Sequence, residues 1–211
     1  MRAVILVLFS LLSSSILDAN KNPPLSCDIL IKNGRVVDGS GNPWFYADIA
    51  IKDGRITDIG KSLPHTAPLE IDAKGLVISP GFIDIHSHSD TNILRDGLAQ
   101  SKIRQGVTTE ILGEGGSAAP ATGARTPRSL EIDGKIQRWS TFTEYFDLID
   151  KQTSSVNIAS YVGLGTVWEC VMGNSFARPN ESQFSEMEQL IMTAMQQGAL
   201  GLSSQVMMPP G

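Results

Sequence analysis

Two similar segments near the start of the chain alternate apolar and polar positions. DILIKNGRVVD spans residues 28–38, and DIAIKDGRITD spans residues 48–58 with the same spacing. Alternation of this kind is typical of a half-buried β-strand, and Asn-Gly or Asp-Gly between two such runs indicates a hairpin, because both turn positions need positive φ. Each segment therefore predicts a hairpin. With a further strand at residues 76–79, we expect residues 27–79 to form a small antiparallel β unit.

After Pro80 the apolar pattern changes to short strands separated by helical stretches. Apolar runs predict strands over residues 82–86, 107–112, 155–163 and 199–206. Helical spacing and a Thr141–Glu144 capping box predict helices over residues 91–105, 141–151 and 184–195. Strands that alternate with helices indicate a parallel α/β architecture. Four strands fit either a flavodoxin-like sheet or half of a larger barrel.

The first of these strands ends in a polar stretch. GFIDIHSHSD, residues 81–90, contains His86 and His88, two of only three histidines in the chain. Side chains two apart in a strand share a side, so we expect Asp84 to lie beside both histidines. Two neutral imidazoles at the carboxyl end of a parallel strand can bind a metal ion such as zinc, although a polar surface is the alternative on spacing alone. His65 follows a proline in a loop and is expected to be exposed.

The extreme N-terminus has the pattern of an export signal. Arg2 precedes an apolar run, residues 3–12, that is too short to span a bilayer, and small residues favour cleavage after Ser15 or Ala19. Residues 1–19 therefore predict a signal peptide and a periplasmic or secreted protein, with a buried N-terminal helix as the alternative. No later apolar stretch is long enough to cross a membrane.

Composition narrows the class of protein. Hydrophobic residues make up 41% of the chain and charged residues 18%, which is enough apolar side chain for a globular core. The net charge of −5 and the lack of a basic patch argue against a nucleic-acid partner. Cys27 and Cys170 form no disulfide framework, so we interpret them as free or buried thiols.

SPGFIDIHSHSD, together with the two similar segments before it, resembles the amidohydrolase superfamily. SKIRQGVTTEILGEGGSAAP, SYVGLGTV and ALGLSSQVMMPPG narrow this resemblance to its N-acyl-D-amino-acid deacylase (D-aminoacylase) branch. The resemblance implies the N-terminal part of a small β-sandwich at residues 20–79. Residues 80–211 would then be the first half, strands one to four, of a (β/α)₈ TIM barrel. The family's catalytic aspartate would lie beyond Gly211, so we expect an N-terminal fragment that has no catalytic residue of its own and is inactive alone.

The resemblance also implies a metal centre. By this resemblance, His86 and His88 on strand one would be ligands of one or two divalent ions, usually zinc. On strand two the branch carries Gly-Asn-Cys-Gly, whose cysteine binds metal, whereas residues 113–116 of this chain are GEGG. Because a carboxylate is an adequate zinc ligand, we predict that Glu114 replaces the thiolate. A solvated loop glutamate is the alternative, and Glu110, inside the strand, is a less favoured substitute.

The activity that follows is metal-dependent hydrolysis of the amide bond of small N-acyl-D-amino acids by the full-length form. No lysine follows Lys151, which argues against the branches that bridge two metals with a strand-four lysine. Ser203 and Ser204 are weak candidates for substrate binding. Leu164 and Trp168, at the end of strand three, are assigned to packing.

Two other readings stay open on the sequence. One is an amidohydrolase that acts on cyclic amides or dipeptides. The other is a non-enzymatic exported metal-binding domain. The sequence leaves the acyl group, the preferred side chain and the oligomeric state undecided.

Overall fold

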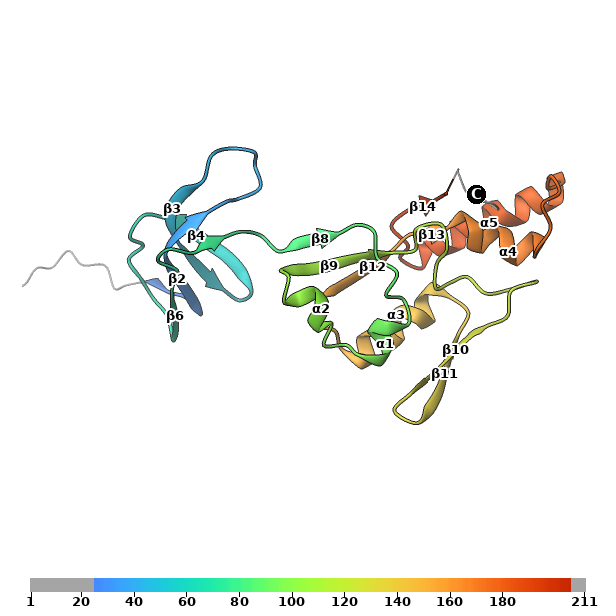
Figure 1. The fold of residues 1–211 in the computed structure, drawn as a ribbon, viewed down its shortest axis with the longest axis horizontal. Coiled ribbons are helices and arrows are strands. Elements are labelled where there is room, and N and C mark those ends of the chain that lie inside the picture. The colour runs from blue at the N-terminus through green and yellow to red at the C-terminus, as the bar shows by residue number, and fades with distance from the viewer. Residues whose placement is uncertain (1–24, 206–211) are drawn as a thin grey trace, which may run out of the picture. The chain divides into compact units, whose positions relative to one another are not determined.

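The structure is a computed structural model that describes residues 25–205, and the chain divides after Pro80 into two compact units (Figure 1). The predicted signal peptide at residues 1–19 lies outside the described residues. Within residues 25–205, no helix is both long enough and apolar enough to cross a membrane.

The first unit is built from β-strands. They are β1 (Leu25–Ser26), β2 (Ile29–Val36), β3 (Phe45–Lys52), β4 (Arg55–Gly60), β5 (His65–Thr66), β6 (Leu69–Asp72) and β7 (Val77–Ile78). The main sheet has the order β4-β3-β2-β6, and β7 also pairs with β2. Strands β2, β3 and β4 are antiparallel, but β6 and β7 run parallel to β2. The prediction of a wholly antiparallel unit is therefore wrong, because the connections from β4 return β6 and β7 along β2.

The two similar segments fold differently. In the second, β3 and β4 form the predicted hairpin around Asp53 and Gly54, both of which have positive φ. In the first, β2 continues through Asn33 and Gly34 as a single strand. The register of β2 with β3 shifts between Ile31 and Gly34, so the predicted first hairpin is wrong and a β-bulge takes its place.

Contacts from the rest of the unit explain the bulge. The backbone N–H of Asn33 donates to Asp48 Oδ1 over 2.9 Å, so the positive-φ residue is bonded within the sheet. A Cβ added to Gly34 would lie 2.0 Å from Ile78 Cδ1, which shows how closely the strand backbone is packed. Because β2 has neighbours on both edges, continuing the strand pairs more backbone groups than turning there would.

Two smaller expectations have opposite outcomes. The side chain of His65 is only 5% exposed, and its Nε2 lies 3.1 Å from Asp58 Oδ2, so the prediction of an exposed loop histidine is wrong. His65 and Thr66 form β5, which pairs with β1, so this segment is a short strand and not a loop. Cys27 and Cys170 are both free and buried, as the sequence predicts.

The second unit contains parallel strands whose spatial order follows the sequence. They are β8 (Phe82–Asp84), β9 (Val107–Leu112), β12 (Asn157–Ser160), β13 (Val162–Gly163) and β14 (Leu202–Ser203). β8 pairs with β9 and β9 with β12, while β13 continues β12 and pairs with β14. A flavodoxin-like sheet reverses its strand order at a switch point. Residues 81–205 contain no such reversal, which favours the winding of a barrel.

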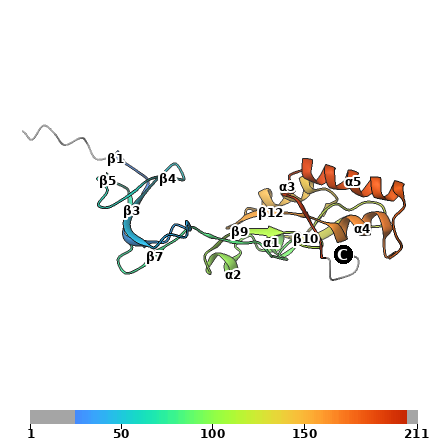
Figure 2. The ribbon, with the colours of Figure 1, turned by 90° about the horizontal axis from the view of Figure 1, so that it is seen from above.

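Helices connect these strands. They are α1 (Asn92–Arg95), α2 (Gln100–Ile103), α3 (Phe142–Gln152), α4 (Leu164–Met172) and α5 (Glu181–Gln196), of which α4 and α5 lie side by side (Figures 1 and 2). The capping box of Thr141 and Glu144 begins α3 as predicted. The single helix predicted over residues 91–105 is instead two short helices. Asp96 Oδ1 accepts the N–H of Leu98 over 3.0 Å, and this local bond breaks the helix.

Two elements of this unit depart from the sequence-based assignment. GLGTVWEC is helical from Leu164, so the assignment of Trp168 to strand three is wrong. The hairpin of β10 (Arg128–Ile132) and β11 (Lys135–Trp139) was not predicted, although Asp133-Gly134 at its turn is the same signal as Asp53-Gly54.

The core of the second unit lies between the strands and the longer helices. Leu112 of β9 and Val162 of β13 are fully buried, together with Phe142, Tyr145 and Val167 from the helices. This core fixes the positions at which the strands end, and the candidate site is built on those ends.

Candidate metal centre

His86 and His88 lie just beyond the end of β8, which stops at Asp84. Their Nε2 atoms are 3.1 Å apart. The prediction that Asp84 shares their side is wrong, because its Oδ2 lies 2.5 Å from Nζ of Lys102 on α2. The register of β8 with β9 shifts between Phe82 and Ile83, and the chain leaves the extended conformation after Asp84, so the alternation assumed from the sequence does not continue.

Glu114 reaches the histidines from the loop that follows β9. Its Oε2 lies 2.5 Å from His86 Nε2. One ligand atom from each of His86, His88 and Glu114 lies within 4.8 Å of the other two. Gly113 and Gly115 on either side of Glu114 have φ of 86° and 68°, which glycine adopts without the strain of a Cβ. The GEGG sequence thus turns sharply enough to aim the carboxylate at the imidazoles.

The donor set of this cluster fits a divalent cation. Glu114 Oε2 is buried, and apart from its contact with His86 Nε2 it has no hydrogen-bond partner among residues 25–205. A buried carboxylate oxygen is costly without a partner, and a cation is a partner that carboxylate and imidazole groups can share. Two imidazole nitrogens and one carboxylate oxygen are ordinary zinc ligands that leave a fourth position open.

Behind the histidines lies a second polar cluster that sequence analysis missed. Glu110 of β9 is 1% exposed, and its Oε2 accepts hydrogen bonds from Ser87 Oγ at 2.5 Å and from Ser89 Oγ. Lys102 Nζ lies 3.4 Å from the same oxygen. Glu110 therefore faces away from the three converging side chains. The available signal was the His-Ser-His-Ser order of residues 86–89, which places serines on the opposite side from histidines.

Ser203 has a defined contact, whereas Ser204 is exposed. Ser203 Oγ donates to the carbonyl of Gly113 over 2.5 Å and accepts the N–H of Gly115 over 3.0 Å. One hydroxyl therefore bonds the backbone on both sides of Glu114. The structure gives Ser203 a role in holding this loop, while substrate contact by either serine stays a prediction.

The carboxylates that flank the histidines have other partners. The hydrogen bond from Lys102 is the main cause that lowers the pKa of Asp84. Burial raises the pKa of Asp90, whose Oδ1 accepts no hydrogen bond from the described part of the chain. Within residues 25–205, neither carboxylate bonds a histidine side chain; Asp84 Oδ1 accepts only the backbone N–H of His86, over 3.2 Å.

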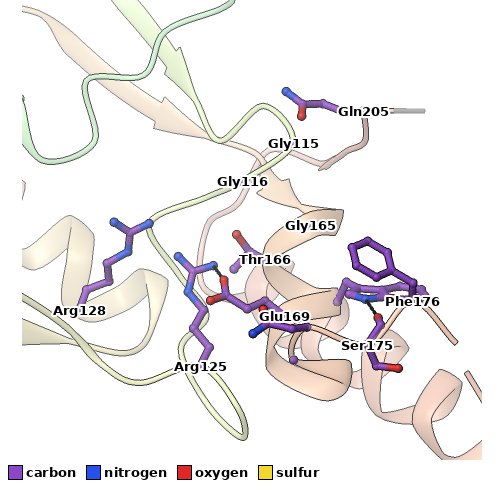
Figure 3. Close-up of a pocket in the computed structure, with 13 residues that line it drawn as sticks. Gly115, Gly116, Arg125, Arg128, Gly165, Thr166, Glu169, Ser175, Phe176 and Gln205 are labelled. Atoms are coloured by element: carbon purple, nitrogen blue, oxygen red, sulfur yellow. Dashed lines mark hydrogen bonds and ion pairs between the residues drawn. The ribbon is translucent and has the colours of Figure 1, made fainter. Parts of the chain in front are cut away.

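A pocket of about 560 Å³ begins beside Glu114, at Gly115 and Gly116 (Figure 3). Arg125 crosses its wall and pairs with Glu169 over 3.2 Å, and burial lowers the pKa of this guanidinium. Trp168, predicted to be a packing residue, also lines the pocket. The pocket gives the second unit a concave surface that contains cationic and aromatic side chains next to the loop of Glu114.

Comparison with known proteins decides the family. The sequence profile described as the amidohydrolase family matches residues 69–205, more than half of the chain and including all three converging residues. The chain belongs to the amidohydrolase family. This amidohydrolase is 36% identical over 156 residues to a D-aminoacylase of Alcaligenes xylosoxydans xylosoxydans, a match that covers 72% of this chain and 32% of the relative. The chain thus spans about a third of the length of that relative.

Solved structures agree with this placement. An N-acyl-D-glutamate deacylase from Bordetella bronchiseptica, solved with zinc and a phosphonate mimic of the tetrahedral intermediate, superimposes with a TM-score of 0.77 at 33% identity. The match covers 88% of this amidohydrolase and 40% of that chain. A D-aminoacylase described as having a binuclear metal centre gives a TM-score of 0.76 at 32% identity, with 87% of this chain and 40% of that one covered. These relatives place the amidohydrolase in the D-aminoacylase branch.

Proposed function

We propose that this chain belongs to a metal-dependent hydrolase that cleaves the amide bond of N-acyl-D-amino acids. The observation that supports this most directly is the convergence of His86, His88 and Glu114 at the ends of two adjacent parallel strands. Two relatives with this fold are a D-aminoacylase and an N-acyl-D-glutamate deacylase, and the second was solved with zinc.

Residues 81–205 are proposed to be four strands of an eight-stranded barrel, completed by polypeptide outside this sequence. The sequential strand order supports this proposal. So does the exposure of Ile83 within β8 and of Ile85 just after it, which are 61% and 71% exposed. Large apolar side chains gain roughly 1.5–3 kcal/mol each on burial, so an opposite barrel wall would stabilise this face. On this proposal, the chain alone is inactive.

His86, His88 and Glu114 would hold the ion, as one site or as part of a pair. A divalent ion held there would lower the pKa of a water molecule and polarise an amide carbonyl. The chain's own residues supply three ligand atoms, and His86 lies at the exposed edge of the site. The remaining ligands and the general base are proposed to come from the other barrel strands.

The substrate is proposed to be a small N-acyl-D-amino acid. An amidohydrolase for cyclic amides or dipeptides is the alternative within the family. The test uses the complete protein that contains this chain, loaded with zinc. We expect it to release free D-amino acids from N-acetyl-D-amino acids faster than it opens hydantoin or cleaves dipeptides. A higher kcat/KM on either of the latter would overturn the proposal.

Export is proposed on the pattern of residues 1–19 alone. N-terminal sequencing of the mature protein from its native host tests this point. A new terminus after Ser15 or Ala19 supports it, and an intact Met1 on the mature protein contradicts it.

A further inference from the structure

The polar cluster behind the histidines is centred on the buried Glu110 and joins three parts of the second unit. Its members are Asp84 at the end of β8, Ser87, Ser89, Lys102 on α2 and Glu110 on β9. A carboxylate as deeply buried as Glu110 loses its hydration, and that loss is offset only by hydrogen bonds and an opposite charge. Two serine hydroxyls and the Lys102 ammonium provide both.

The alternating residues of the segment 86–89 point in opposite directions. Ser87 and Ser89 donate to one oxygen of Glu110, and their own hydroxyls lie 3.0 Å apart. His86 and His88 instead meet Glu114. Because the four residues are consecutive, fixing the serine side chains also fixes the backbone from which the imidazoles project.

Lys102 connects this arrangement to the helix layer. Its Nζ lies 2.5 Å from Asp84 Oδ2, 3.2 Å from Ser87 Oγ and 3.4 Å from Glu110 Oε2. One ammonium thus bonds residues on both sides of the point where the chain leaves β8. The start and the middle of the histidine segment are therefore both attached to the same ammonium, which also pairs with the buried Glu110.

We propose that Glu110 is a positioning residue of the metal centre: it holds Ser87 and Ser89 so that the backbone between them presents His86 and His88 to the ion. The inference rests on the proposed metal-dependent function and deepens it. Glu110 acts through the serines and faces away from the site, unlike Glu114. Loss of partners that orient metal ligands typically costs about 10–100-fold in metal affinity, which is the size of effect expected here.

The test measures zinc affinity and stability separately in the complete protein. Zinc dissociation constants come from competition with a chromophoric chelator, and stability comes from thermal unfolding of the metal-free form. The variants are Glu110→Gln and the double variant Ser87→Ala with Ser89→Ala. The control is Asp48→Asn, which alters another buried carboxylate that holds backbone N–H groups of Asn33 and Leu63 in the first unit.

Both test variants are expected to bind zinc about 10–100-fold more weakly. Asp48→Asn is expected to lower the unfolding temperature while its zinc affinity stays within about twofold of the wild type, since it touches only the first unit. If Glu110→Gln does not fold, the serine double variant decides, because it keeps the pair of Glu110 and Lys102. Zinc affinity in the serine variant that falls no further than in the control overturns the inference.

The inference and the proposed function fail in different ways. If zinc binding survives the loss of both histidines, the proposed metal site is wrong. If zinc binding is lost with the histidines but is unchanged in both test variants, only the positioning role of Glu110 is wrong.

Discussion

The two segments that form the candidate site are held in place by different means. Residues 84–89 carry the histidines and are attached through side chains to a buried carboxylate and an ammonium. Residues 113–116 carry Glu114 and are shaped by positive-φ glycines, with one hydroxyl from Ser203 bonding the backbone. The first segment depends on buried charge and the second on backbone geometry. We therefore expect that removing the polar partners of the first segment lowers zinc affinity more than removing those of the second.

The largest effect is expected where the ligands themselves are removed from the first segment. His86→Ala combined with His88→Ala takes away two of three converging ligand atoms. We expect the complete protein to retain almost no stoichiometric zinc after dialysis, as measured by mass spectrometry of the metal. The unfolding temperature of the metal-free protein should change little, because His86 is mostly exposed. Zinc content equal to that of the wild type would contradict the assignment of both histidines.

In the second segment, removing the charge of the ligand is expected to have the next largest effect. Glu114→Gln keeps the shape of the side chain but loses the negative charge that compensates a cation. Zinc affinity should fall by at least the roughly 10–100-fold that loss of an orienting partner costs, because here the ligand itself is changed. Chelator competition measures the change. Retained affinity would make Glu114 a loop residue, as the alternative reading of the sequence allows.

The neighbouring variant Glu114→Asp is the matched control for that measurement. It keeps the charge but shortens the side chain, and the Oε2 of Glu114 contacts His86 at 2.5 Å. We expect an intermediate loss of zinc affinity. Equal losses in Glu114→Asp and Glu114→Gln would show that reach matters as much as charge.

Local sequence signals predicted the elements of the fold better than their pairing. The capping box of Thr141 correctly placed the start of α3, because its bonds lie within one turn of helix. Asn33-Gly34 and Asp53-Gly54 carry nearly the same local signal, yet only the second forms a hairpin turn. The difference comes from Asp48 and Ile78, which are distant in sequence and pack against the first pair. Tertiary contacts of this kind cannot be read from periodicity.

Local sequence signals also pointed to the converging residues of the candidate site. Motif spacing pointed to His86 and His88, and the GEGG departure from the branch pattern pointed to Glu114. The partners that hold them were missed, because Lys102 lies in a helix whose break at Asp96 was not predicted. The predicted orientation of Asp84 was also wrong, since the alternation of apolar and polar residues does not reveal a register shift in β8.

The smallest effect is expected from the single hydroxyl that holds the second segment. Ser203→Ala removes the bonds to the Gly113 carbonyl and the Gly115 N–H, and each such bond contributes about 0.5–1.5 kcal/mol. The glycine loop keeps its other contacts, including the bond from Gly165 N–H to the Gly115 carbonyl at 2.9 Å. Stability of the complete protein should therefore fall by roughly 1–2 kcal/mol in urea unfolding, at most the sum of the two bonds. Zinc affinity should fall only a few-fold, less than in Glu110→Gln.

Ser204→Ala is the control, because this neighbouring serine is exposed, and it should change neither quantity. A loss of zinc affinity in Ser203→Ala as large as in Glu110→Gln would show that both segments depend equally on their polar partners, and the contrast between buried charge and backbone geometry would be wrong.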